Sequence, residues 1–114
     1  MTRMWMVDPK ILCKNHLLGE HKEVHQLLGS IKRKIGITGY VKNNCVEVTS
    51  LVERHDILAE EIVRRGWNHK SPILYSQEEI LEMACSYLPE SEVQYIVDAE
   101  SSLHDLRNRC SNCG

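Results

Sequence analysis

The chain has 114 residues, with 14 Lys and Arg against 16 Asp and Glu and a formal net charge of −2. This length suits a single domain over residues 1–114 with one hydrophobic core. No stretch of sequence is long and apolar enough to cross a membrane, and the first ten residues lack the layout of a signal peptide. We therefore expect a cytoplasmic protein with no membrane contact.

Positive charge is concentrated at one end of the chain. Residues 1–44 hold eight Lys and Arg against three acids, a net charge of +5, and residues 45–114 hold six against thirteen, a net charge of −7. The whole-chain charge argues weakly against nucleic-acid binding, but a regional excess of positive charge is typical of it. An ordinary surface with charges of both signs is the alternative interpretation.

The first predicted element is one long helix from about Pro9 to Lys34. Asp8 suits the N-cap and Pro9 the first helical position. The triplet Lys32-Arg33-Lys34 suits the C-terminal end of the helix dipole. Four apolar residues at steps of seven, four and three mark the face that we expect to be buried: Leu17, Val24, Leu28 and Ile31.

The middle of the chain is predicted to contain a loop and a second helix. Residues 36–44 indicate a loop, and residues 45–48 could form a short extended segment. The second helix begins at Thr49 or Ser50 and ends at Gly66, a natural residue just past a helix end. Its expected buried positions are Leu51, Ile57 or Leu58, and Ile62.

Two further helices are predicted in the C-terminal third. Ser76, with Glu79 three residues later, forms a capping box at the start of a helix that stops near Pro89. Ser91 begins a last helix that ends near Arg109. Its expected inward positions are Val93, Ile96 or Val97, and Leu103. The predicted fold is a small all-α bundle of three to four helices with a long N-terminal helix.

A second face of the long helix carries polar groups. His16, Glu20 and Glu23 follow one another at steps of four and three and therefore share a stripe. Two carboxylates one turn apart repel each other unless a cation lies nearby. The cation that we expect there is the start of the chain itself, Thr2 and Arg3.

These residues resemble the pyrimidine-dimer DNA glycosylase family, also called the endonuclease V family. The first matching block joins Thr2-Arg3 with His16-Leu17, Glu20 and Lys22-Glu23. The second block holds Leu51-x-x-Arg54, Leu58-x-Glu60 and the turn Arg65-Gly66-Trp67-Asn68. The resemblance covers roughly residues 2–70 and has no clear continuation after Asn68.

The resemblance implies a DNA-repair glycosylase and abasic-site lyase that acts on UV-damaged DNA, with Thr2 and Glu23 as catalytic residues. An α-amine has a pKa of about 7.7–8.0, against about 10.4 for a lysine side chain, so part of it is neutral and nucleophilic near pH 7. In the implied reaction the Thr2 amine attacks C1′ of the sugar and forms an imine, and β-elimination then cuts the strand. Glu23 would stabilise positive charge on the sugar and transfer protons. The chemistry requires removal of Met1, which the small Thr2 side chain permits.

Further residues are expected to contact DNA. The resemblance implies this role for Arg3, His16, Lys22 and Gln26. We add Lys32 and Arg33 from their charge, although a solvated helix end would explain them equally well. Lys22 replaces an arginine and cannot grip a phosphate as a two-pronged fork.

Several departures from the family keep other functions open. Gln26 stands where the resemblance leads us to expect arginine, and the chain lacks an aromatic-rich C-terminal tail. The same chemistry on another modified base, or on abasic sites only, is therefore an alternative. A non-catalytic helical DNA-binding module is another. The expected partner is double-stranded DNA with damaged bases, and we expect a monomer without a cofactor.

The histidines and cysteines raise a separate question. His21 and His25 flank the polar stripe, and we expect them to face solvent. Free thiols are the default for the five cysteines, because a cytosolic chain keeps them reduced. However, Cys13-x-x-His16 and Cys110-x-x-Cys113 have the pairwise spacing of a structural zinc site. Since His16 is also an expected DNA contact, the two roles compete.

Overall fold

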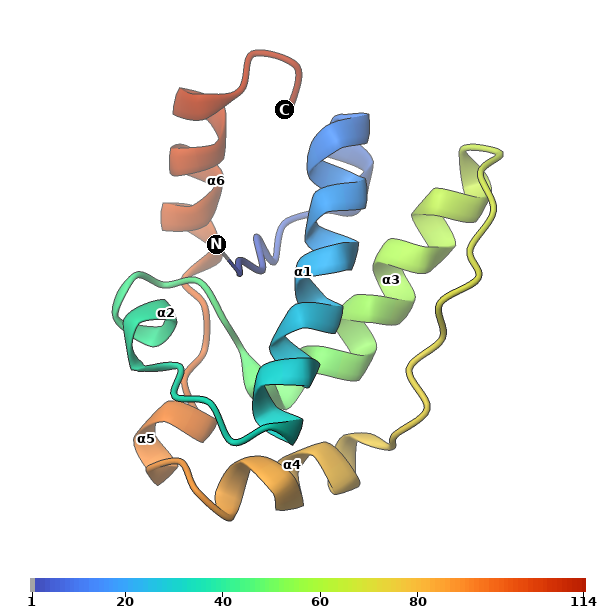
Figure 1. The fold of residues 1–114 in the computed structure, drawn as a ribbon. Helices are drawn as coiled ribbons and strands as arrows, with labels where there is room; N and C mark the ends of the chain where they lie inside the picture. Colours follow the sequence, from blue (N-terminus) through green and yellow to red (C-terminus); the bar gives the residue numbers. More distant parts are fainter. Residues whose placement is uncertain (1) are drawn as a thin grey trace.

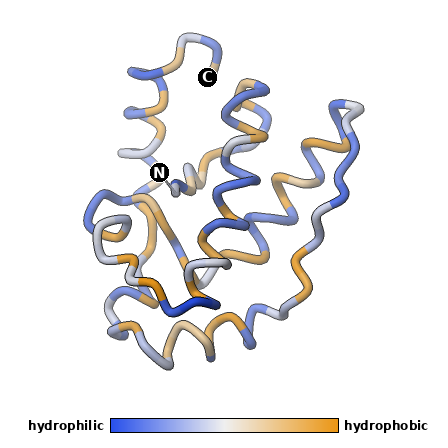
Figure 2. Tube along the Cα trace, in the orientation of Figure 1, coloured by the Kyte–Doolittle hydropathy of each residue, from blue (hydrophilic) through white to orange (hydrophobic). Residues whose placement is uncertain are grey.

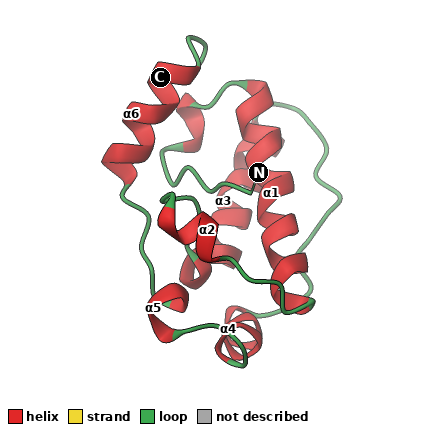
Figure 3. Ribbon diagram, turned by 60° about the vertical axis from the view of Figure 1, so that its left-hand side comes forward, coloured by secondary structure: helices red, strands yellow, loops and turns green. Residues whose placement is uncertain are grey.

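A computed structural model describes residues 2–114, which contain helices and no strand (Figure 1). The elements in chain order are the 3-10 turn η1 (Pro9–Ile11), α1 (Lys14–Lys32), α2 (Thr38–Lys42), the 3-10 turn η2 (Val48–Ser50), α3 (Leu51–Arg64), α4 (Gln77–Cys85), α5 (Glu90–Val93) and α6 (Ala99–Arg109). The all-α prediction is confirmed, and the four longer helices α1, α3, α4 and α6 form the predicted bundle. Figure 3 shows the same helices joined by loops only.

The N-terminal helix is shorter than predicted. It begins at Lys14 rather than Pro9, because Leu12 and Cys13 are extended and separate it from η1. Two contacts replace the helical hydrogen bonds at this break: Arg65 donates to the carbonyl of Leu12 at 2.7 Å, and the backbone N–H of Cys13 donates to Sγ of Cys113 at 3.1 Å. Both partners lie far away in the sequence, so the local pattern does not reveal the break.

Two other helical predictions need correction. Residues 36–44 are not only a loop, since they contain α2. The predicted last helix is divided: α5 ends at Val93, and α6 begins at Ala99 after Asp98 caps it by accepting from Ser101 N. Between them the N–H of Val97 donates to the buried Glu47 carboxylate at 2.8 Å, which holds this linker out of helical geometry. Val97 is therefore buried, whereas Ile96 is 63% exposed.

α1 and α3 form the centre of the molecule. They run side by side in opposite directions, and α4 lies across their lower ends in the view of Figure 1. The apolar faces predicted for these helices are confirmed, except that Ile57 is exposed and Leu58 is the buried residue. The buried members are Leu17, Val24, Leu28 and Ile31 of α1 and Leu51, Leu58 and Ile62 of α3. Burial of such a side chain contributes roughly 1.5–3 kcal/mol.

The N-terminal segment and the C-terminal tail both pack beside α1. The segment before η1 runs beside α6, and the C-terminal tail returns to this region, where Gly114 N donates to Ile11 O at 2.9 Å. Figure 2 shows hydrophobic residues along this N-terminal segment as well as on the central helices. Among the described residues, none of the helices combines the length and hydrophobicity needed to cross a bilayer.

Candidate active site

The start of the chain is buried rather than free in solvent. Thr2 is only 5% exposed, and Met4 is fully buried. The N–H of Met4 donates to the carbonyl of Cys45 at 2.6 Å, and Sδ of Met4 accepts from the N–H of Glu47. These contacts fix residues 2–4 against the segment that leads into η2. The expected chemistry requires removal of Met1, and this residue lies outside the described residues.

Arg3 is held by other parts of the protein. Its guanidinium forms an ion pair with Asp105 of α6 at 2.8 Å and stacks 3.9 Å from the centroid of the Trp5 ring. Its Nε is buried and has no hydrogen-bond partner among the described residues. Arg3 therefore joins the chain start to α6, and its role as a DNA contact stays a prediction.

Glu23 lies next to the chain start. Its side chain is half-buried, and its carboxylate lies near the backbone N–H of Arg3. Burial raises the pKa of this carboxyl above 4.5, and the Arg3 N–H opposes the rise because it favours the charged form. Gly19, one turn earlier, lies beside this carboxylate, since a Cβ there would be 3.6 Å from Oε2 of Glu23, an ordinary van der Waals distance. The helix thus directs Glu23 toward the residue that follows Thr2.

Glu20 has a different partner from the one expected. It is fully buried, and Arg54 of α3 donates to both of its carboxylate oxygens, at 2.6 and 2.9 Å. Arg54 also donates to the carbonyl of Val7 at 2.7 Å. The expectation that the chain start would neutralise this carboxylate is wrong. Glu20 instead ties together α1, α3 and the N-terminal segment.

Lys22, Gln26 and Lys32 of α1 and its C-cap residue Arg33 are exposed. Lys22, Gln26 and Arg33 follow one another at steps of four and seven, so they share a face beside Glu23. Arg33 also donates to the carbonyl of Gly29 at 3.2 Å, which caps the helix end, and Lys32 lies over the Tyr75 ring at 5.0 Å. These contacts within the protein help to position Lys32 and Arg33. DNA contact by either residue stays a prediction.

The His16 ring contacts cysteines. Its Nδ1 lies 3.1 Å from Sγ of Cys13 and 3.4 Å from Sγ of Cys113, and Cys13 Sγ lies 3.9 Å from Cys110 Sγ. The four side chains predicted as a zinc set are thus brought together. Burial raises the pKa of the Cys113 thiol to about 12, whereas the backbone N–H of Asn112 lowers that of Cys110.

A second cluster was missed by the sequence analysis. His21 and His25 do not face solvent but pack against His55 of α3 and His69 of the loop before α4, with ring centroids about 5 Å apart. Burial, followed by the charges of its three neighbours, lowers the pKa of His21 to about 4. The only feature of the sequence that hinted at a histidine cluster is the number of histidines, six in the chain.

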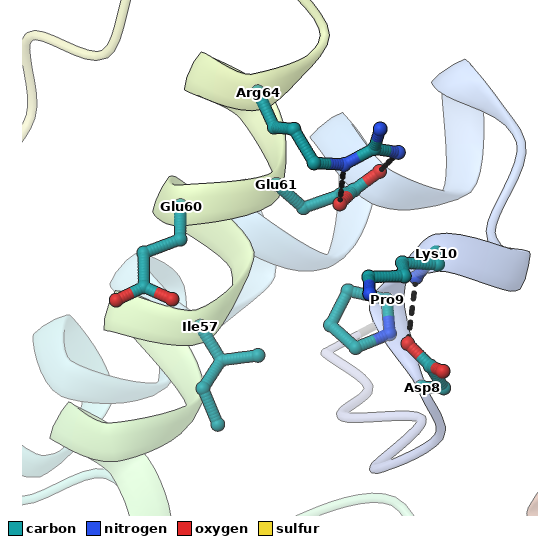
Figure 4. Close-up of a pocket in the computed structure, with 7 residues that line it drawn as sticks. All are labelled: Asp8, Pro9, Lys10, Ile57, Glu60, Glu61 and Arg64. Atoms are coloured by element: carbon teal, nitrogen blue, oxygen red, sulfur yellow. Dashed lines mark hydrogen bonds and ion pairs between the residues drawn. The ribbon is translucent and has the colours of Figure 1, made fainter.

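The pocket shown in Figure 4 is separate from these groups. It has a volume of about 230 Å³ between the N-terminal segment and α3, and Asp8, Ile57 and Glu61 help to line it (Figure 4). Arg64 donates to both oxygens of Glu61, and this hydrogen bonding, joined by Arg65, lowers the pKa of the Glu61 carboxyl to about 2. Neither Thr2 nor Glu23 lines this pocket.

Comparison with known proteins agrees with the two matching sequence blocks. A family model described as pyrimidine dimer DNA glycosylase matches residues 2–75, somewhat beyond the predicted 2–70. This range includes the chain start, α1 and α3, and it ends before α4. Neither the curated proteins nor the solved structures contain a match.

Proposed function

Because this chain belongs to the pyrimidine dimer DNA glycosylase family, we propose that it attacks UV-damaged DNA with the α-amine of Thr2 and uses Glu23 to assist. Family membership supports the coarser statement, a DNA-repair glycosylase for UV damage whose substrate is DNA. The nucleophile, the role of Glu23 and the abasic-site lyase step belong to the proposal.

The reaction begins once Met1 has been removed. The nitrogen of Thr2 forms a bond to C1′ of the damaged nucleotide, and the bond from C1′ to the base breaks, so that the base leaves with the electron pair and takes up a proton. Loss of a proton from nitrogen and opening of the sugar give an imine, which is a covalent intermediate. The imine acidifies the proton on C2′. Removal of that proton breaks the bond from C3′ to its phosphate oxygen and cuts the strand.

Glu23 acts twice in this scheme. As a carboxylate it stabilises the positive charge that develops on the sugar when the base leaves, and a half-buried carboxylate does so more strongly than one in water. It then accepts and returns protons during imine formation and elimination. The observation that carries the proposal is the position of the half-buried Glu23 carboxylate near the backbone of Arg3, the residue that follows the nucleophile.

Preorganisation of the chain start supports the same proposal. A nucleophile on a frayed terminus would lose most of the advantage of proximity. Here three contacts hold the N-terminal segment in place. Arg3 forms an ion pair with Asp105, and the N–H of Met4 donates to the carbonyl of Cys45. Arg54 donates to the carbonyl of Val7. The exposed face formed by Lys22, Gln26 and Arg33 lies beside Glu23, where it could contact DNA phosphates.

A Glu23→Gln variant tests the proposal. It keeps the size and polarity of the side chain but removes its charge, so single-turnover cleavage of UV-irradiated duplex DNA should slow by on the order of 10²-fold or more while DNA binding is retained. Glu82→Gln, on the exposed surface of α4, is the matched control and should cleave at the parent rate. Thr2→Ser should also stay active, because the reacting group is the backbone amine. Cleavage by Glu23→Gln at the parent rate would remove Glu23 from the mechanism.

A further inference from the structure

Four metal-binding side chains from the two ends of the chain converge beside the start of α1. Cys13 and His16 lie at the beginning of α1, and Cys110 and Cys113 lie in the tail after α6. Their ligand atoms all lie within 4.8 Å of one another, and all of these cysteines are free thiols. We propose that Cys13, His16, Cys110 and Cys113 bind one structural zinc ion.

The distances between ligand atoms match tetrahedral zinc. Zinc–sulfur bonds of about 2.3 Å and zinc–nitrogen bonds of about 2.0–2.1 Å at tetrahedral angles place two sulfurs about 3.8 Å apart and a sulfur and a nitrogen about 3.6 Å apart. The Sγ atoms of Cys13 and Cys110 lie 3.9 Å apart. Nδ1 of His16 lies 3.1 Å from Sγ of Cys13 and 3.4 Å from Sγ of Cys113. The set is closed, with four protein ligands, which is typical of a structural rather than a catalytic site.

The surroundings also suit a thiolate cluster. Three thiolates and one neutral imidazole leave a net charge of −1 around a zinc ion, and cations lie close by. Arg65 donates to the carbonyl of Leu12, directly before Cys13, and the Arg107 side chain runs along Gly114, directly after Cys113. The N–H of Cys13 already donates to Sγ of Cys113 at 3.1 Å, the kind of outer contact that orients a metal-bound sulfur.

The site would fasten the C-terminal tail to the segment that carries Thr2. The family match ends at residue 75, so Cys110 and Cys113 lie outside it. Without the metal, the tail is tied to η1 mainly by the bond from Gly114 to Ile11 and by the contact of Cys113 with Cys13. The Trp5 ring packs against His16 edge to face, with centroids 5.8 Å apart, and connects the cluster to Arg3. Because Nδ1 faces the thiols, only Nε2 of His16 remains for any contact with DNA.

Metal analysis and cobalt substitution test this site on the full chain. Protein purified under reducing conditions without chelator should contain about one zinc bound by thiolates, and a chelator should lower its melting temperature. Cobalt-loaded protein should show the strong sulfur-to-cobalt absorption of a thiolate site. Cys85→Ser, an exposed cysteine outside the cluster, is the control and should keep the metal and the absorption.

Two variants separate loss of the ligands from loss of the fold. The double variant Cys110→Ser, Cys113→Ser should lose the zinc that the thiolates bind and the sulfur-to-cobalt absorption. Cys110→His keeps four possible ligands and should retain zinc with a weaker absorption. If reduced wild-type protein with native circular dichroism binds no zinc through thiolates and shows no sulfur-to-cobalt absorption, the proposal is wrong. Retention of both by the double variant would also overturn it.

The histidine cluster supports a second metal site on separate evidence. Nε2 of His69 lies 2.9 Å from Nε2 of His21 and 3.3 Å from Nε2 of His55. Three imidazole nitrogens bound to one zinc at tetrahedral angles would lie about 3.4 Å apart. From this convergence we infer a site for a divalent transition metal on His21, His55 and His69.

The neutral form of His55 can present a metal-binding nitrogen to this cluster. Asp56 accepts from Nδ1 of His55 at 2.9 Å, so in the neutral imidazole Nε2 carries the lone pair, and this is the form that binds a metal. This lone pair faces the carbonyl of Ser71 at 2.9 Å as well as Nε2 of His69. A cation between these atoms removes the repulsion. A groove of about 670 Å³ lined by His55 and His69 opens beside them, so a fourth ligand could come from solvent.

Stoichiometry distinguishes the two sites. Wild-type protein should bind about two divalent metal ions, and His69→Ala should lose one while keeping the sulfur-to-cobalt absorption. The exposed His104→Ala is the control and should lose none. NMR of the imidazole nitrogens gives a second readout that does not depend on the variant, since metal binding shifts Nε2 of the three ligands. An unchanged spectrum on addition of zinc, or an unchanged metal count in His69→Ala, would exclude the histidine site.

Discussion

The buried ion pair between Glu20 and Arg54 gives the sharpest prediction about stability. Glu20 is fully buried and Arg54 is 4% exposed, and the guanidinium donates three hydrogen bonds of 2.6 to 2.9 Å, two to Glu20 and one to Val7. Replacement by Arg54→Met would keep the length of the side chain but leave the carboxylate without its cation. Breaking such a pair from one side costs about 3–5 kcal/mol.

That loss is large for a protein of this size. A domain of this kind has a free energy of unfolding of about 5–15 kcal/mol. With a urea m value of about 1–3 kcal/mol per molar, the midpoint of unfolding should fall by roughly 2 M. Urea unfolding followed by circular dichroism measures it. The Val7 contact is lost as well, so the N-terminal segment should loosen and any reaction at Thr2 should slow.

A double variant provides the control. Glu20→Leu combined with Arg54→Met removes both charges and should recover much of the lost stability, because the penalty comes from the unpaired charge rather than from the absence of the pair. A loss below about 1 kcal/mol for Arg54→Met alone, or an equal loss for the double variant, would refute this reasoning.

Three further predictions concern catalysis, DNA binding and folding. Burial raises the pKa of Glu23, so on acidification the single-turnover rate should fall at a higher pH than an ordinary glutamate would give, as the carboxylate gains a proton, and Glu23→Gln should lack that step in its pH profile. Reversing Lys32 and Arg33 to Glu should weaken binding to damaged and undamaged duplex alike and make the salt dependence shallower; unchanged binding across a salt titration would remove this helix end from the interface. Ser76 and Glu79 form the capping box of α4, so Ser76→Ala should lower the free energy of unfolding by about 1 kcal/mol, measured by thermal or urea unfolding.

Features set by nearby residues could be predicted from the sequence. The buried face of α1 depends on apolar spacing, and the capping box depends on two residues three apart, so both were found and confirmed. The pairing of Cys13 and His16 with the cysteines of the tail was also open to prediction, because each pair has the spacing of a zinc motif. Only the approach of the two pairs required the fold.

Features set by distant partners could not be predicted. Arg54 neutralises Glu20 across 34 positions of sequence, and the polar stripe on α1 gave no sign that one of its carboxylates points inward. The break before α1 depends on Arg65, and the break before α6 depends on Glu47. The histidine cluster draws on three separate elements, so no local spacing identifies it. At the two breaks a tertiary contact overrides the local helical preference.

The most direct test of the central claim is borohydride trapping with the amine of Thr2 either free or blocked. Protein with Met1 removed should form a borohydride-stable adduct with UV-irradiated or abasic duplex DNA, because borohydride reduces an imine to a stable amine. Mass spectrometry should place the adduct on the Thr2 nitrogen. Retention of one extra residue would displace the amine by ~3–4 Å and should abolish the adduct. Equal trapping by the blocked protein, or an adduct on a lysine side chain, would contradict the mechanism.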